Sequence, residues 1–337
     1  MKTKFVILLP VYNGEDTIGR AIESVLNQTY RNFEMIIIND GSSDSTLEVC
    51  RKYAESNNQI EVVTRENRGL ASARNLGIKL AGRKGSDIKV VWLDADDELC
   101  DILGDLNDEF VSNPEVDAIF YDYDVVKSDG KRVDNRYLCQ NFGGNEKIKG
   151  KEALKKILIG DINNYMWAFA ADIHCYQGVY FPEGKKYEDL ATLYKIVDNT
   201  NFVFMMKRKG YKYYVDNPNS LSKNFTHQDA YDLLDTISEV DEYLNDKGLL
   251  DYTAIFEAIY LCNIIISLSA KKDKESKKIN QLVNRYFEER RHRLKFHIYR
   301  KSRYAKKIEL MKWRLIEPVY GLKRMIKNEK IGNYCAK

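Results

Sequence analysis

The chain has 337 residues, of which 44% are hydrophobic and 31% are charged, a composition typical of a globular protein larger than one average domain. Its six cysteines form no C-x-x-C pair, which argues against a zinc site or a disulfide framework and fits a reducing cytoplasm. The formal net charge is +3, but the segment from residue 290 onward holds 16 Lys and Arg and three Glu, so a mildly acidic body precedes a basic tail.

The first hundred residues alternate between two hydrophobic periods. Continuous apolar runs predict buried strands at residues 5–9, 33–39, 60–64 and 88–93. Apolar residues at helical spacing predict helices at residues 15–28, 46–56 and 69–81. The first apolar run follows two lysines but is too short for a signal peptide, so we interpret it as a strand. Such alternation is typical of a parallel sheet with right-handed crossovers.

The pattern after residue 101 is less regular. A strand is expected at 117–126, helices at 151–159 and 188–197, and a β-hairpin whose two strands, 202–206 and 211–215, flank a Lys-Arg-Lys-Gly turn. From about residue 227 the chain is expected to be helical to the end. We place a boundary in the Asn-Pro-Asn-Ser segment at 217–220, which divides the chain into residues 1–222 (a nucleotide-binding part, 1–100, and an acceptor-side part, 101–222) and a helical region, 223–337.

An apolar run at residues 90–93 stops in a cluster of carboxylates that includes Asp94 and Asp96. Ligands of open α/β sheets bind at the carboxyl ends of the strands. If the chain stays extended, the side chains of Asp94 and Asp96 leave on the same side, and two hard oxygen ligands there suit Mg²⁺ or Mn²⁺ on a diphosphate. The alternative is a plain turn, since Asp favours turns.

Two further polar residues are expected near the same edge of the sheet. Asp40 follows the second strand and could accept the imide N–H of a uracil ring, although Asp40-Gly41 could also be a simple turn and Asp44 a helix cap. Arg74 lies about one turn into the helix that begins after Gly69, where it could approach a phosphate. A solvated helical residue is the alternative for Arg74.

Four segments, in this order, resemble the successive signatures of family 2 glycosyltransferases with the GT-A fold. They are Leu9-Pro10-Val11-Tyr12-Asn13-Gly14-Glu15, Ile38-Asn39-Asp40-Gly41-Ser42-Ser43-Asp44, Glu66-Asn67-Arg68-Gly69-Leu70-Ala71-Ser72-Ala73-Arg74-Asn75 and Leu93-Asp94-Ala95-Asp96-Asp97. The resemblance covers the first hundred residues and extends more loosely to about residue 222. It implies an α/β chain with the GT-A nucleotide-diphospho-sugar transferase fold, with a mainly parallel central sheet and a C-terminal helical region.

The resemblance also implies a UDP-sugar site. Asp40 would contact the uracil, Arg74 would lie near the nucleotide, and the base and ribose pocket would be lined by Pro10, Val11, Tyr12 and Glu15. Asp94, followed by Ala95, would face the ribose or sugar, while Asp96 would bind the Mn²⁺ or Mg²⁺ cofactor on the diphosphate. Asn39 stands where the family often has an additional Asp, but Asp40 is retained.

The segment 181–190 resembles the later Glu-Asp motif of the family, at the start of a helix. Asp189 is the expected base that deprotonates the acceptor, and Glu188 is the alternative, or positions a sugar hydroxyl. An acidic residue in a first helical turn is the purely structural reading of Asp189. Trp167 fits an aromatic position where a sugar can stack, but Ala168-Phe169-Ala170-Ala171 follows it instead of a basic residue, and an ordinary core position fits as well.

The basic tail mixes cations with aromatic and aliphatic residues, as does a helix that lies on an anionic membrane surface. Packing against the catalytic domain is the alternative, and the acidic body argues against nucleic acid as a partner. The most apolar stretch, 252–268, contains Glu257 and Asn263 and falls short of a spanning segment. We therefore expect a cytoplasmic protein, peripheral at the inner face of the cell membrane.

The expected function is inverting, metal-dependent transfer of a hexose or N-acetylhexosamine from a UDP-sugar to a hydroxyl of a lipid-linked glycan acceptor, in the synthesis of a capsule or another cell-surface polysaccharide. A nucleotidyltransferase that makes nucleotide sugars is an alternative, but it would be expected to have a Gly-rich, basic loop after the first strand. A non-catalytic scaffold that binds a nucleotide sugar is the third reading.

Overall fold

The computed structural model describes residues 2–133, 140–141, 143–217, 225–269, 271, 273–316 and 318–320, and in these residues it contains one nine-stranded sheet. The strands are β1 (Lys4–Val11), β2 (Phe33–Asn39), β3 (Ile60–Thr64), β4 (Ile88–Trp92), β5 (Glu98–Leu99), β6 (Val116–Val126), β7 (Glu146–Lys149), β8 (Phe169–Asp172) and β9 (Phe202–Tyr214). The helices are α1 (Ile18–Leu26), α2 (Thr46–Ser56), α3 (Leu70–Ala81), α4 (Leu103–Ser112), α5 (Gly150–Leu158), α6 (Leu193–Asp198), α7 (His227–Leu244), α8 (Leu250–Leu268), α9 (Lys274–Arg290), α10 (Phe296–Tyr299) and α11 (Ala305–Lys312).

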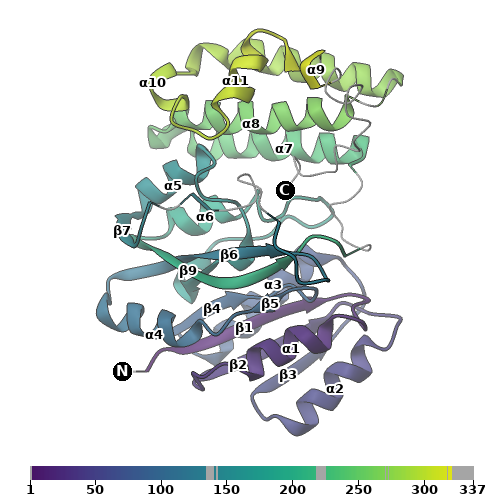
Figure 1. Cartoon of the computed structure of the whole chain (residues 1–337), viewed down its shortest axis with the longest axis vertical. Helices are drawn as coiled ribbons and strands as arrows, with labels where there is room; N and C mark the ends of the chain where they lie inside the picture. Colours follow the sequence, from purple (N-terminus) through teal and green to yellow (C-terminus); the bar gives the residue numbers. More distant parts are fainter. Residues whose placement is uncertain are drawn as a thin grey trace.

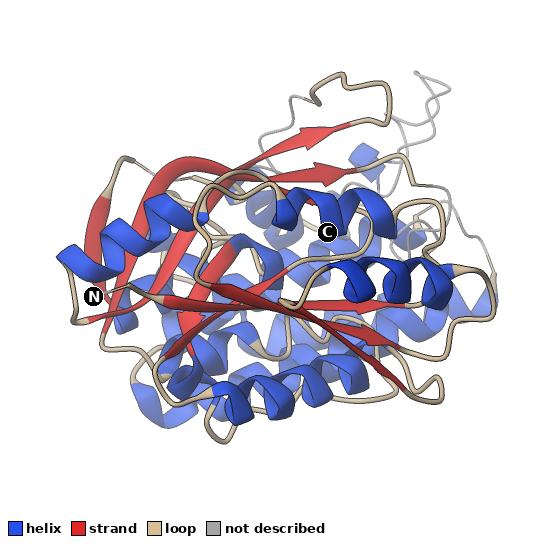
Figure 2. Ribbon diagram, turned by 90° about the horizontal axis from the view of Figure 1, so that it is seen from below, coloured by secondary structure: helices blue, strands red, loops and turns tan. Residues whose placement is uncertain are grey.

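The molecule is layered. Figure 1 shows α1 and α2 beyond one side of the sheet, α5 and α6 on the other side, and α7 to α11 stacked past them at the far end. In the view from below, the strands form one twisted layer with helices in front of it and behind it (Figure 2). The strand order is β3-β2-β1-β4-β8-β6-β9-β5, with β7 beside β9.

The first four strands confirm the alternation predicted from the sequence. β3, β2, β1 and β4 are parallel neighbours, and the register pairs Val11 with Asn39 and Leu8 with Trp92. Their carboxyl ends therefore meet at one edge, where the acidic residues follow. Helix α3 approaches this sheet closely at Gly77, because a Cβ there would lie 3.3 Å from Leu8 Cδ1 and 3.5 Å from the Trp92 ring.

The second half of the sheet is mixed. β8 is antiparallel to both β4 and β6, whereas β6 and β9 are parallel. The predicted hairpin at 202–215 is wrong, because β9 is a single strand that pairs with β6 from end to end, with irregular register near Tyr121 and Asp122. Gly210 allows close packing there rather than a turn, since a Cβ would lie 2.8 Å from Tyr121 Cδ2.

Two predicted helices begin later than expected. The helix predicted at 15–28 begins at Ile18, after a turn that follows β1. The helix predicted at 188–197 begins only at Leu193, and residues 188–192 form a turn. Asp189 therefore lies in the turn before α6 and not in the first turn of the helix.

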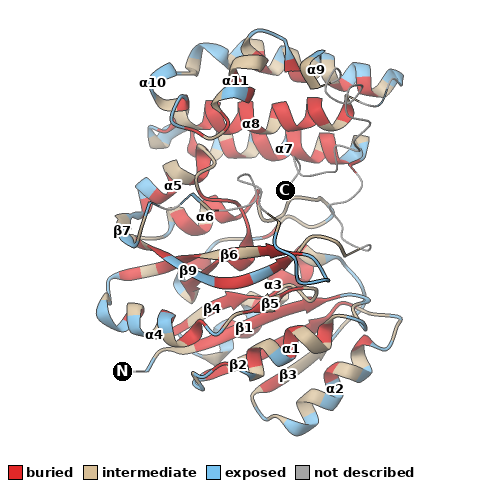
Figure 3. Cartoon of the chain, viewed as in Figure 1, coloured by how far each residue is buried: buried red, intermediate tan, exposed pale blue. Residues whose placement is uncertain are grey.

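Helix α8 is the core of the C-terminal helical stack. Among the described residues it is the one helix long and apolar enough to cross a membrane, but 72% of its apolar window is buried inside the protein (Figure 3). Its polar residues have protein partners: Glu257 lies 3.7 Å from the Arg290 guanidinium, and Asn263 accepts a hydrogen bond from Lys307. These contacts are those of a buried helix in a globular core.

The described part of the basic tail packs on the rest of the protein. Ser302 donates a hydrogen bond to the Ile159 carbonyl at 2.7 Å, and the Tyr304 ring fits against Gly160, where a Cβ would lie 2.5 Å from the ring. The alternative of packing against the catalytic domain is therefore confirmed for this part of the tail. The predicted boundary at 217–220 and the end of the tail lie largely outside the described residues.

Candidate active site

Asp40 joins the end of β2 to the loop between β3 and α3. Its carboxylate is nearly inaccessible and accepts hydrogen bonds from Arg65 Nε at 2.7 Å and from the backbone N–H of Gly69 at 2.7 Å, with a longer one from the N–H of Arg68. The Arg65 Nη2 also approaches Asp40 Oδ1 at 2.6 Å. Asp40 thus fixes the shape of the loop before α3, in addition to the contact with a uracil ring that is expected of it.

Reciprocal hydrogen bonds hold the loop after β1 against the loop after β2. Glu15 Oε2 accepts from the N–H of Ser45 at 2.8 Å, and Asp44 Oδ2 accepts from the N–H of Glu15. Pro10 and Val11 are buried at the end of β1, whereas Tyr12 is 53% exposed. The four residues that were expected to line a nucleotide pocket therefore lie at the end of β1 and on the braced loop that follows it, in which Tyr12 has an exposed aromatic ring.

The segment 94–97 is a turn, as the alternative interpretation has it, so the condition that the chain stays extended is not met. The N–H of Asp97 donates to the Asp94 carbonyl, which closes the turn through Ala95 and Asp96. The Asp96 carbonyl accepts from Arg20 Nη2 at 2.6 Å, and its Oδ2 accepts from Asn217 Nδ2 at 2.8 Å. The two carboxylates, Asp94 and Asp96, are therefore turned toward different partners.

Asp97, which the sequence did not single out, anchors this turn to β9. It is fully buried and accepts from the Tyr211 hydroxyl at 3.0 Å and from the N–H of Tyr214 at 2.8 Å. The Tyr211 oxygen in turn accepts the N–H of Asp94. No local pattern separates Asp97 from Asp96, because the partners of Asp97 lie more than a hundred residues further along the chain.

Arg74 lies at the centre of the acidic residues. Its side chain is 3% exposed and donates to Glu188 Oε1 at 2.7 Å and to Asp94 Oδ1 at 3.3 Å. Burial opposes its charge, but Glu188, Asp94 and Asp189 together raise the pKa of Arg74 above its ordinary value. The alternative of a solvated helical residue is thereby excluded for Arg74.

Asp189 differs from Glu188 in its environment. Its Oδ1 accepts the N–H of Leu190 at 2.7 Å, and it makes no direct ion pair with a described residue. Burial first, and then the neighbouring Glu188 charge, raise the pKa of Asp189 to about 7, against the opposing effect of Arg74. A carboxylate with a pKa near neutrality can both take up and release a proton under ordinary conditions.

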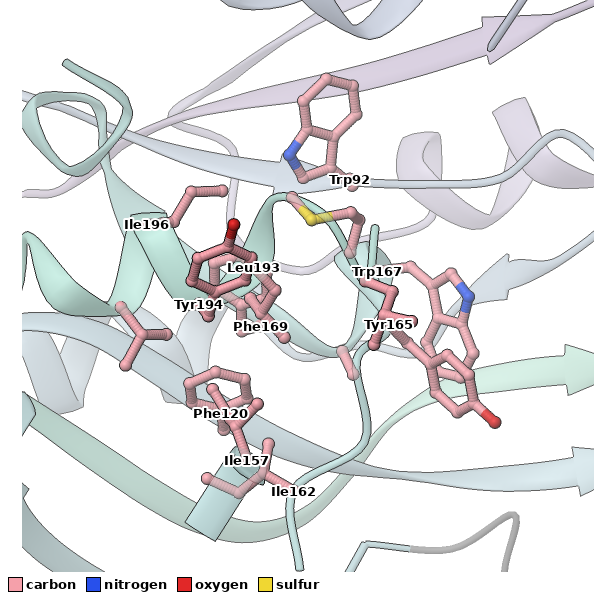
Figure 4. Packing of buried hydrophobic residues seen from close by; sticks show 14 of the residues in the cluster. Trp92, Phe120, Ile157, Ile162, Tyr165, Trp167, Phe169, Leu193, Tyr194 and Ile196 are labelled. Atoms are coloured by element: carbon pink, nitrogen blue, oxygen red, sulfur yellow. The ribbon is translucent and has the colours of Figure 1, made fainter. Parts of the chain in front are cut away.

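Trp167 belongs to the core. It is 4% exposed and stacks on Tyr211 and Tyr165, with ring centroids 4.4 and 4.7 Å away, as the close view of the buried cluster shows for Tyr165 (Figure 4). Its backbone carbonyl accepts from the buried Tyr121 hydroxyl. The sugar-stacking role expected of Trp167 has no exposed ring face to support it.

The residues suited to a metal ion are few. In the described part of the chain, no group of three or more His, Cys, Asp or Glu side chains converges as a metal site. Mg²⁺ and Mn²⁺ are commonly held by one or two carboxylates together with substrate phosphates, so a single carboxylate at a turn beside the sheet edge is compatible with such an ion. Asp96, whose Oδ1 accepts no hydrogen bond from a described residue, has this character.

Comparison with known proteins places this site in a family. The family described as "Glycosyl transferase family 2" matches residues 6–214. The chain is 25% identical over 259 residues to glycosyltransferase GlyA of Streptococcus pneumoniae, which covers 73% of this chain and 35% of GlyA. It is 27% identical over 225 residues to glycosyltransferase GlyG of the same species, and this match covers 60% of this chain and 71% of GlyG. The chain thus spans about a third of the length of GlyA.

The fold is also similar to a solved structure. The crystal structure of S. aureus TarS 1–349 in complex with UDP-GlcNAc superposes with a TM-score of 0.69 at 17% identity, over 95% of this chain and 92% of that one. This likeness confirms the α/β GT-A-like fold with a C-terminal helical region. The matched segment, residues 6–214, covers more than half of the chain and contains Asp40, Arg74, the turn at 94–97 and Asp189. The chain therefore belongs to glycosyl transferase family 2.

Proposed function

We propose that the protein transfers a sugar from a UDP-sugar to a hydroxyl group of a glycan, with inversion at the anomeric carbon. The observation that carries the proposal is the placement of Asp189, a partly buried carboxylate with a pKa of about 7, beside the Arg74 that also binds Asp94 of the strand-end turn. The buried cation Arg74 thus contacts both the loop that holds the proposed base, Asp189, and the turn at residues 94–97, where the nucleotide would bind.

The proton would move to Asp189. As the acceptor oxygen attacks the anomeric carbon, the bond between that carbon and the UDP oxygen breaks, and the acceptor proton passes to Asp189. Glu188 is less suited to this role, because its Oε1 already accepts from Arg74 at 2.7 Å. Arg74 would keep Glu188 turned away from the acceptor while its charge limits the rise in the pKa of Asp189.

The donor would lie along the carboxyl ends of β1, β2 and β4. A UDP nucleotide is favoured because the similar TarS structures are complexes with UDP-GlcNAc and with UDP. Tyr12 offers an exposed ring on the loop after β1, and the loop that contains Asp40 would border the uracil. Mn²⁺ or Mg²⁺ held by Asp96 would supply positive charge to the departing diphosphate.

A lipid-linked acceptor and a membrane location are supported by the exposed residues of the described part of the tail, between 295 and 313. Phe296 and Trp313 are 61% and 71% exposed. Phe296 packs edge-on against Tyr299, whose hydroxyl accepts from Lys312 at 2.9 Å. Four exposed cations nearby make no ion pair within the described residues: Lys295, Arg300, Lys301 and Lys306. Exposed aromatics among free cations favour an anionic membrane surface and hence a lipid-linked acceptor, at the cytoplasmic face.

Liposome flotation tests this location. The double change of Phe296 and Trp313 to Ser is expected to weaken binding to vesicles that contain phosphatidylserine, while Val111→Ser, an exposed apolar residue on α4, is not. Equal binding of both variants would contradict a membrane role for this surface.

A panel of nucleotide sugars tests the reaction itself. We expect one UDP-sugar to raise the melting temperature and to release UDP in the presence of Mn²⁺ and a glycan acceptor. Equal protection by GDP-sugars would contradict the uracil site, and formation of a nucleotide sugar from a nucleoside triphosphate would instead identify a nucleotidyltransferase. Binding without any UDP release, with all acceptors, would indicate a scaffold.

A further inference from the structure

The loop before Asp189 is attached to a helix outside the sheet. Lys186 donates its backbone N–H to Asp232 Oδ2 at 3.0 Å, and its Nζ lies 3.0 Å from Asp229 Oδ2. Both acids belong to α7, the first helix of the C-terminal stack, and both are buried, at 6% and 3% exposure. A second cation of the loop, Lys185, pairs with Asp235 and Glu239 on the solvent side of the same helix.

The loop needs such an anchor, because its backbone is strained immediately before the acidic pair. Tyr187 has φ +65°, a left-handed conformation that L-residues with large side chains rarely adopt. Strain of this kind costs on the order of 1–3 kcal/mol and persists only where the surroundings over-determine the conformation. The anchored N–H of Lys186 belongs to the peptide unit between Lys185 and Lys186, so the anchor holds the chain one residue before the strained Tyr187.

Asp232 is placed to act on this backbone rather than on a substrate. Its Oδ2 accepts from Lys186 and its Oδ1 accepts from Gln228 Nε2 at 2.8 Å, one turn earlier on α7. A buried carboxylate must have such donors to offset its loss of water. The contact is made to a main-chain group, so it holds the loop whatever side chain occupies position 186.

We propose that Asp232 is a positioning residue for the base: it holds the loop through the Lys186 N–H, so that Asp189 is presented at the sheet edge. The inference rests on the proposed function for its kinetic readout. It also gives α7 and the helical region a part in the reaction, beside the contact that Arg74 of α3 makes with Glu188 of the same loop.

Three variants separate the backbone contact from its surroundings. Asp232→Ala removes the acceptor but favours the helix, while Asp232→Asn keeps a carbonyl oxygen for Lys186, with Gln228 free to turn its amide and accept from the new amide group. Lys186→Ala removes the ion pair with Asp229 and keeps the N–H. Asp235→Ala is the matched control, because it removes an exposed partner of the same loop, 64% accessible.

The first measurement is hydrogen–deuterium exchange of segment 183–190 in the full chain. We expect faster exchange in Asp232→Ala than in wild type, and exchange close to wild type in Asp232→Asn, Lys186→Ala and Asp235→Ala. Unchanged exchange in Asp232→Ala would overturn the inference, and this holds even if no sugar transfer is found.

The second measurement is transfer kinetics. Asp232→Ala is expected to lower kcat by roughly 10²-fold with little change in donor KM, because a misplaced base slows the proton transfer without weakening nucleotide binding. Asp232→Asn should recover most of the rate.

The pH profile of kcat gives a further readout. Among the described residues, the groups that face Asp189 are Glu188 and Tyr187 from its loop, Arg74 and Asp94 from the sheet side, and Tyr260 from α8. None of these groups is altered in Asp232→Ala. A loosened loop should admit water to Asp189 and so weaken the burial that raises its pKa, and the acid limb of the pH profile of kcat should then move to lower pH.

The outcomes distinguish the two proposals. An active wild type whose kcat and pH profile are matched by Asp232→Ala would overturn the positioning role alone. An inactive wild type whose segment 183–190 still loosens only in Asp232→Ala would overturn the proposed function and leave the anchor established.

Discussion

Arg74 Nη1 donates a hydrogen bond to Glu188 Oε1 at 2.7 Å, and this contact joins α3 to the loop that contains Asp189. The same guanidinium reaches Asp94 at 3.3 Å, at the start of the turn formed by residues 94–97. Three segments that are far apart in the sequence are thus held by one buried cation. Its removal would leave carboxylates facing one another without compensation.

Arg74→Ala is therefore expected to lower the free energy of unfolding by about 3 kcal/mol, as is typical when one partner of a buried pair is removed. Arg68→Ala is the control, because Arg68 is 67% exposed in its pair with Glu183 and should contribute less than about 1 kcal/mol. Urea unfolding of both variants measures the difference. Equal losses would show that the Arg74 cluster is no more than a surface pair.

The rate of transfer is expected to follow the ionisation of Asp189. Because its pKa is raised to about 7, kcat should fall roughly tenfold for each pH unit below neutrality. Asp189→Asn should lower kcat by about 10²–10⁴-fold and abolish this acid limb, while UDP affinity measured by calorimetry stays the same. An acid limb near pH 4 in the wild type would contradict the role of Asp189.

The same carboxylate should make stability depend on pH. Its folded-state pKa is about 7, above the ordinary value of 3.8, so the stability contributed by the protonated form is present below about pH 4 and is lost as pH rises through 7. Asp189→Asn, which stays neutral, should therefore melt at a higher temperature than wild type at pH 8, with a smaller difference at pH 5. A variant less stable than wild type at pH 8 would reverse the expected sign.

Adjacent aspartates should respond differently to substitution. Asp96→Ala is expected to remove the increase in UDP affinity that Mn²⁺ produces, with little loss of stability, because this carboxylate is only partly buried. Asp97→Asn should keep the response to Mn²⁺ but lower the melting temperature, since its carboxylate is buried and accepts from Tyr211 and Tyr214. Calorimetry with and without Mn²⁺, together with thermal melts, distinguishes the two roles. An Mn²⁺ response that persists in Asp96→Ala would exclude it as a ligand.

Much of the structure of the first hundred residues could be predicted from the sequence. Parallel strands buried on both faces are continuous apolar runs, so the bounds of β2 and β3 were predicted to the residue and the ends of β1 and β4 nearly so. The acidic residues at strand ends then predict one site, because parallel strands present their carboxyl ends at a common edge. The family match and the likeness to the TarS structure confirm the family and the α/β fold, while the site remains a prediction.

What the local pattern could not decide depends on contacts between distant segments. The two apolar runs at 202–206 and 211–215 have the composition of a hairpin, but pairing along the whole of β6 makes them one strand. Trp167 has the same sequence signal whether it stacks on a sugar or on Tyr211, and only the packing of β9 decides between them. Asp96 and Asp97 are neighbours in the chain, yet one lies at the edge and the other in the core.

The sequence by itself therefore determined the order of the first strands and helices and the carboxylates that follow the strands, because hydrophobic periodicity and residue chemistry are local properties. Only the tertiary structure decided which of these carboxylates are buried against protein donors, as Asp97 is, and which stay partly exposed, as Asp96 does. That decision rests on Arg74, Tyr211 and the α7 anchor at Asp232, whose partners lie dozens of residues or more away in the chain. Contacts at such separations are set by packing of the whole fold, which no short segment specifies.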